Sequence, residues 1–79
     1  MPKDDYTPIA CALHDEYEIA IMHKAPMRLR WRDASGTWRH GTVLPLDLVV
    51  ANGEEFLRFR REDGQEEQIR LDRLSPEPA

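Results

Sequence analysis

The chain has 79 residues, and its 15 acidic residues outnumber its 11 Lys and Arg, which gives a formal net charge of −4. This length predicts a single domain over residues 1–79, with a core at 6–74 and frayed ends at 1–5 and 75–79. The lone Cys11 excludes an intramolecular disulfide, and no stretch of about 20 apolar residues is available to span a membrane. We therefore expect a cytoplasmic protein that carries no cofactor and no metal.

The charges change sign along the chain. Residues 1–25 hold five acids against two lysines, residues 26–46 hold four arginines against Asp33 alone, and the remainder holds nine acids against five arginines. The acidic first and last segments argue against sequence-independent nucleic-acid binding by the whole molecule, because Lys and Arg supply that affinity. The basic middle keeps such binding possible on a local surface.

A short helix is predicted in the first third of the chain. Asp15 can accept hydrogen bonds from backbone amides of a first turn, and Glu18, three residues later, can complete a capping box. Tyr17 and Ile21 are four residues apart and share one helical face, which we expect to lie on the core. The helix is expected to begin at Asp15 or, alternatively, nearer Cys11.

Strand-like segments follow Pro26, which is expected to end the helix. The segment 27–32 alternates apolar and cationic residues, and this period of two predicts a half-buried strand with Leu29 and Trp31 inward. Turn signals and proline divide the rest of the chain. We expect a bend or bulge near Gly41, and we expect Pro45 to interrupt that strand or to mark its edge. The later strands are predicted at residues 37–44, 55–61 and 67–74, with turns at Asn52-Gly53 and Asp63-Gly64.

One helix followed by short antiparallel strands, the second strongly curved, predicts a mainly β protein. We expect a small Sm-like antiparallel barrel or sandwich with one N-terminal helix. The order of helix, strand, turn and bent strand resembles that of the RNA chaperone Hfq.

A spaced motif runs through nearly the whole chain, from residue 6 to residue 74. It reads Tyr6-x-Pro8-Ile9-x-Cys11, then Asp15-x-x-Glu18-x-Ala20, and closes with Leu71-Asp72-Arg73-Leu74. This pattern resembles the Rho-binding antiterminator (Rof) family of small bacterial proteins, which is described with the same Sm-like topology.

The resemblance implies a function as well as a fold. Members of the family bind the transcription termination factor Rho at or beside its primary RNA-binding site, block RNA engagement and so suppress Rho-dependent termination. Asp15 and Glu18 match the acidic positions of the motif and are the partner-binding residues that the resemblance implies. Glu16 is added from local charge, and Asn52 from the expectation that its turn lies near the helix.

A small RNA-binding module is the alternative. A basic sheet face with Trp38 nearby would suit a single strand, because cations follow phosphates and aromatic rings stack on bases. Acids in the same strands can pair with these arginines, so we expect a charge-matched face, no direct nucleic-acid binding and a monomer when free. The arginines of this alternative face are Arg28, Arg30, Arg32, Arg58 and Arg60.

Catalytic patterns are weak in this sequence. The three histidines, His14, His23 and His40, are scattered, with no spacing typical of a metal site or a nucleophile and its base. Cys11 precedes His14 by three residues, but no third group orients such a pair, and we expect Cys11 to be a small buried hydrophobe. We expect a binding protein and not an enzyme.

Overall fold

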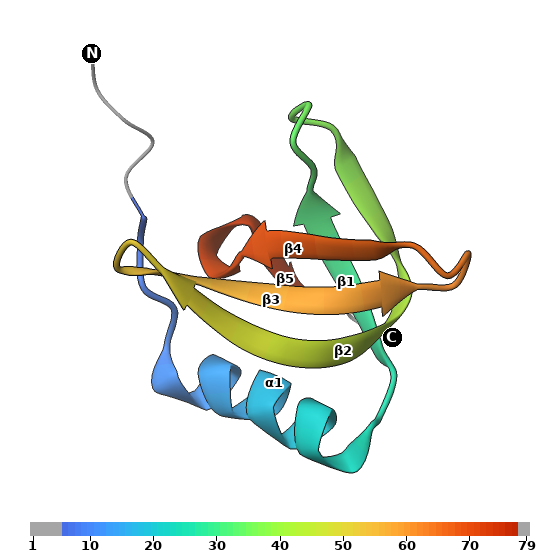
Figure 1. The fold of residues 1–79 in the computed structure, drawn as a ribbon, viewed down its shortest axis with the longest axis horizontal. Coiled ribbons are helices and arrows are strands. Elements are labelled where there is room, and N and C mark those ends of the chain that lie inside the picture. The colour runs from blue at the N-terminus through green and yellow to red at the C-terminus, as the bar shows by residue number, and fades with distance from the viewer. Residues whose placement is uncertain (1–5, 78–79) are drawn as a thin grey trace.

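The computed structural model describes residues 6–77, so the predicted frayed ends at 1–5 and 78–79 lie outside the described residues. A helix comes first along the chain and five strands follow it, with a short 3₁₀ helix before the last strand (Figure 1). The elements are α1 (Cys11–His23), β1 (Met27–Arg32), β2 (Trp38–Ala51), β3 (Glu54–Arg61), β4 (Glu66–Arg70), η1 (Leu71–Arg73) and β5 (Leu74–Pro76).

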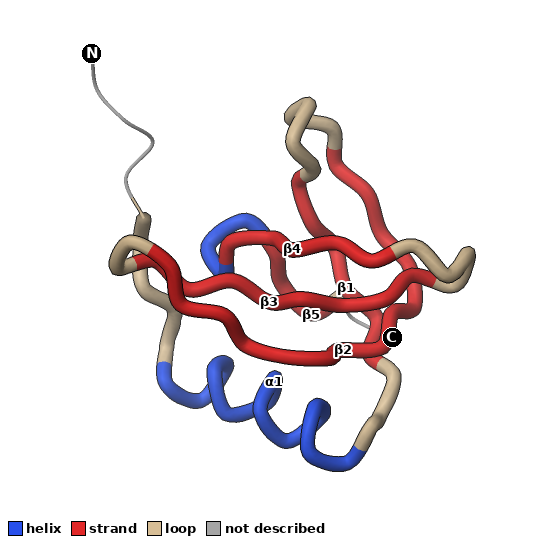
Figure 2. The backbone as a smooth tube through the Cα atoms, viewed as in Figure 1, coloured by secondary structure: helices blue, strands red, loops and turns tan. Residues whose placement is uncertain are grey.

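The five strands form one antiparallel sheet in the order β4-β3-β2-β1-β5. This confirms the prediction of a mainly β protein with one N-terminal helix. Strands β4 and β5 are the two edges of the described sheet, so the sheet is open and is not closed into a barrel, which was one of the two expected forms. The helix lies along β2, and the hairpin of β1 and β2 projects away from it (Figure 2).

Helix α1 begins earlier than Asp15. Its N-cap is Ala10, whose backbone is extended and whose side chain makes no capping hydrogen bond, while Ala10 O accepts hydrogen bonds from the amides of Leu13 and His14. The helix ends at His23, and the next residue, Lys24, takes the left-handed conformation that usually favours glycine at this position. The predicted capping box is therefore wrong, whereas the alternative start near Cys11 is confirmed.

Alternation along β1 is confirmed. Leu29 is fully buried and Trp31 nearly so, while the alternate residues Arg28, Arg30 and Arg32 are exposed. Trp31 packs edge-on against Phe59, with ring centroids 5.0 Å apart. The buried core around this pair comprises Tyr17, Leu29, Trp31, Val43, Leu57, Phe59, Ile69, Leu71 and Leu74.

Strand β2 continues through Pro45 instead of stopping there. It pairs with β1 over its first part and with β3 over its second part, which lets one strand link the two halves of the sheet. The register shifts between Pro45 and Asp47, whereas Gly41 lies opposite Leu29 in an uninterrupted register. The irregularity therefore falls at the residue without a backbone N–H and not at the predicted glycine.

The last predicted strand, 67–74, is divided in the structure. Strand β4 ends at Arg70, the 3₁₀ helix turns the chain, and β5 then pairs with β1 on the opposite edge of the sheet. Residues 75–77, predicted as a frayed tail, are held in place, since Ser75 pairs with Arg30 and the amide of Glu77 donates to Arg28 O. Within residues 6–77, no helix is long and apolar enough to cross a membrane.

Candidate functional site

The acidic residues of α1 lie away from the core. Tyr17 is fully buried and Ala20 is 6% exposed, so this side of the helix faces the sheet. Asp15, Glu16 and Glu18 are all exposed, and we call these three residues the acidic helix surface. All three were expected to bind a partner, and they lie within the helix and not at its N-cap, so a capping role does not explain them.

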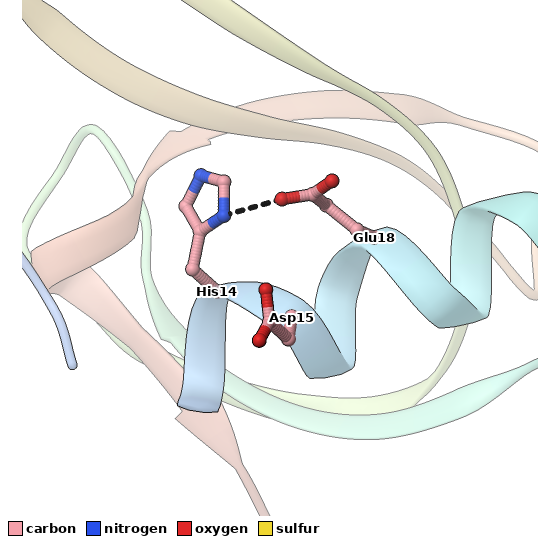
Figure 3. A group of neighbouring side chains, drawn as sticks. All are labelled: His14, Asp15 and Glu18. Atoms are coloured by element: carbon pink, nitrogen blue, oxygen red, sulfur yellow. Dashed lines mark ion pairs between the residues drawn. The ribbon is translucent and has the colours of Figure 1, made fainter. Parts of the chain in front are cut away.

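His14 connects the acidic helix surface to the sheet. Its Nδ1 lies 2.7 Å from Oε1 of Glu18, one turn along the helix, and its Nε2 lies 2.8 Å from Oε2 of Glu55 on β3. The imidazole and the Glu18 carboxylate turn toward each other above the helix, with Asp15 on the turn between them (Figure 3). The side chain of His14 therefore holds the first half of the helix against the hairpin formed by β2 and β3.

Two carboxylate partners favour the doubly protonated imidazole, because only the imidazolium has a donor on each ring nitrogen. The hydrogen bond to Glu55 is the largest cause that raises the pKa of His14; burial lowers it, and Glu18 adds to the increase. This positive charge lies between two negative ones, so the group of three carries a net negative charge.

A shallow hollow of about 350 Å³ adjoins the acidic helix surface. His14, Asp15 and Glu55 provide its polar lining, and Pro8, Ile9 and Cys11 provide the remainder. A hollow with carboxylates at its rim and apolar carbon in its wall can accommodate a Lys or Arg side chain, whose stem packs while its cationic head pairs.

Asn52 lies in the turn between β2 and β3, exposed and with φ of 53°, which is the left-handed conformation that a tight hairpin requires. The ion pair of Glu55 with His14 joins this hairpin to α1. The hairpin that carries Asn52 is therefore attached to the helix, and no described side-chain contact of Asn52 itself supports a binding role.

The five arginines of the alternative face have different surroundings. Arg58 and Arg60 both pair with Glu66, at 2.9 and 3.2 Å, and Arg28 pairs with Glu77 at 2.8 Å. For Arg30 and Arg32, no carboxylate among residues 6–77 lies within ion-pair distance. The expected charge matching thus holds for three of the five arginines.

His14, Asp15 and Glu18 each place one ligand atom within 4.8 Å of the others. That spacing would suit a cation, but both ring nitrogens of His14 already face carboxylates, and we assign no metal to the group. Cys11 is exposed, which contradicts its predicted burial, and the His14 ring faces glutamates and not the thiol.

Sequence reasoning missed two members of this site, His14 and Glu55. The four-residue spacing of His14 and Glu18 was a usable local signal, since such pairs meet on a helix. Glu55 gave no signal, because its contact with His14 spans 41 positions of the chain. Comparisons with protein-family models, with curated proteins and with solved structures found no match to this chain.

Proposed function

We propose that this protein is a Rho-binding antiterminator, which binds Rho at or beside its primary RNA-binding site and prevents RNA from engaging there. The single observation that carries the proposal is the acidic helix surface: Asp15 and Glu18, the residues at the acidic positions of the motif, are exposed on one helix. A site that attracts phosphates also attracts carboxylates, so the two surfaces are electrostatically complementary.

The fold supports the proposal through its topology. We propose that the protein is Sm-like, because an N-terminal helix precedes five antiparallel strands, β2 is long and shared by both halves of the sheet, and β5 returns to pair with β1. The motif residues serve this arrangement. Tyr6 packs on the core, Ala20 is buried, and Asp72 accepts a hydrogen bond from the amide of Thr7 at 3.0 Å.

Local geometry supports Asp15 as the leading contact. It lines the hollow beside α1, it is exposed, and no described residue forms an ion pair with it, so its carboxylate is available to a cationic partner. Glu18 also contacts His14, so its loss would disturb the helix as well as the surface. Substitution of Asp15 therefore tests binding with the least effect on the fold.

The first prediction concerns Asp15→Lys. Reversing this charge should weaken binding to Rho from the same organism by about tenfold or more, because a like charge then faces a phosphate-binding site. Binding is measured by titration of labelled Rho, and competition by displacement of a pyrimidine-rich RNA strand. Adding Glu18→Lys should abolish binding.

Glu62→Lys is the matched control, since Glu62 is also exposed, has no ion pair with a described residue and lies in the turn after β3. It makes the same change in net charge and should leave Rho affinity unchanged. Equal losses in both variants would show that only overall charge matters. Full binding by a folded Asp15→Lys, Glu18→Lys double variant would remove the acidic helix surface from the interface.

A further inference from the structure

The outer face of the β1–β2 hairpin combines cations with an exposed indole. Arg30 lies opposite His40 and Arg32 opposite Trp38 in the antiparallel register, so these four side chains leave the same face of the sheet. Arg28 is two residues from Arg30 on β1 and shares that face. We call these five residues, Arg28, Arg30, Arg32, Trp38 and His40, the Arg–Trp face.

The Arg–Trp face has more positive than negative charge. Glu77 is its acidic neighbour, and it pairs with Arg28 at 2.8 Å and lies 3.5 Å from His40. Arg30 and Arg32 have no carboxylate of the described chain within ion-pair distance. Asp33, the nearest acid in sequence, pairs with Arg39 at 2.7 Å instead.

Trp38 is 55% exposed, which is unusual for so large an apolar ring. The Arg30 guanidinium lies over this ring, 5.1 Å from its centroid, in a cation–π contact. The contact orients a planar cation and a planar aromatic group at the surface. Bases stack on such planes, and phosphates pair with the arginines beside them.

We propose that the Arg–Trp face binds single-stranded nucleic acid, with Trp38 as the stacking platform and Arg30 and Arg32 as the phosphate contacts. An acidic polypeptide would satisfy the arginines but would not use the exposed indole, so the aromatic ring favours a nucleic acid. We expected no direct nucleic-acid binding because acids in the same strands can pair with the arginines. Among residues 6–77, however, no carboxylate forms an ion pair with Arg30 or Arg32.

This surface is distinct from the acidic helix surface. In Figure 1 the helix lies at the bottom of the view, and the tip of the β1–β2 hairpin, next to Trp38, lies at the top. The two surfaces therefore lie on different parts of the molecule. The inference does not rest on the proposed function, and its test contains no Rho.

The test measures binding of the whole protein to a fluorescently labelled oligouridine of about 10 nucleotides, by anisotropy at a series of salt concentrations. Trp38→Ala should weaken binding about tenfold, since a stacked base is lost, and Trp38→Phe should restore part of it. Arg30→Ala combined with Arg32→Ala should weaken binding and make the slope of log affinity against log salt shallower by about 1.4, at about 0.7 for each lost phosphate contact.

Arg58→Ala combined with Arg60→Ala is the matched control. These arginines have side chains that are 40% and 48% exposed, on the neighbouring strand β3, and both pair with the carboxylate of Glu66. The double control removes the same charge and should change affinity little. Circular dichroism of each variant confirms that the fold is kept.

Three results would overturn the proposal. The first is no measurable binding to oligouridine at low salt. The second is an equal loss of affinity in the two double variants, which would indicate a general charge effect. The third is equal displacement of the oligonucleotide by polyglutamate together with unchanged binding of Trp38→Ala, which would assign the face to acidic proteins.

Discussion

At the scale of single residues, His14 shows how one side chain links a helix to a sheet. Its two ring nitrogens contact Glu18 on α1 and Glu55 on β3, at 2.7 and 2.8 Å. The contact with Glu18 follows from the four-residue spacing on a helix and could be predicted from the sequence. The contact with Glu55 depends on how the hairpin docks on the helix, and no local pattern encodes that.

The protonation of His14 gives a prediction. Because its pKa is raised above the ordinary 6.5, mainly by Glu55, the imidazolium should persist to a higher pH than a free histidine. The stability that it contributes is fully present below about 6.5 and is lost as the pH rises through the pKa of the folded protein. Titration of the imidazole by NMR measures this pKa directly.

Neutral amide variants measure how much Glu18 and Glu55 each contribute to the raised pKa of His14. Glu55→Gln should lower the pKa of His14 more than Glu18→Gln does, since the hydrogen bond to Glu55 is the largest cause of the increase. Glu16→Gln, on the same helix but without a contact to His14, is the control. An unchanged pKa in Glu55→Gln would show that the two side chains do not pair in solution.

At the scale of elements, alternation predicted β1 and β3 well because each has one buried face, as at Leu29 and Leu57. The C-terminal strand was predicted as continuous for the same reason, since Ile69 and Leu71 also alternate with polar residues. The break after Arg70 is decided by tertiary contacts: Arg70 Nε donates to Oδ1 of Asp72 at 2.6 Å across the turn, and β5 pairs with β1. Such long-range pairing has no local signal.

Asp72→Asn tests this turn. Asp72 pairs with Arg70, whose side chain is only 9% exposed, and accepts the amide of Thr7. Its replacement removes one carboxylate partner of this buried cation and leaves Glu54, at 3.4 Å, in place. The free energy of unfolding should fall by about 2 kcal/mol in urea denaturation at neutral pH. Asp63→Asn, which removes an exposed partner of Arg61 in the β3–β4 turn, should cost less.

The pH dependence of Asp72→Asn follows from the ionisation of Asp72. Burial raises the pKa of Asp72, but hydrogen bonds from Arg70 and Thr7 outweigh it, so the net pKa lies below 3.8. The stabilisation is present above about 3.8 and is lost as the pH falls through the pKa of the folded protein. The difference in stability between the original protein and Asp72→Asn should therefore shrink in acid, and a difference that stays constant would assign the effect to shape and not to charge.

At the scale of the whole molecule, the fold places on separate surfaces some of the acidic and basic side chains that are mixed along the sequence. The sequence places acids and arginines in the same strands, and from that pattern an even, neutralised surface is a reasonable expectation. Antiparallel pairing instead puts Glu66 beside Arg58 and Arg60 on β3 and β4, and leaves Arg30 and Arg32 beside Trp38 in the β1–β2 hairpin. A chain with a net charge of −4 thus has an acidic helix and a cationic hairpin on separate surfaces.

The open sheet leads to the last prediction, that the free protein is a monomer. An open sheet has two edges, and rings of subunits form when the edge strand of one copy pairs with the opposite edge of the next. Here β4 carries Glu66 and Glu67, and β5 is only three residues long and ends in Pro76, which has no N–H to donate. Charged, short and proline-bearing edges resist such pairing, so light scattering coupled to gel filtration should give the mass of one chain across a wide range of concentration. A larger mass that grows with concentration would show that β4 and β5 do pair between copies, and the acidic helix surface would then act as a repeated array and not as a single site.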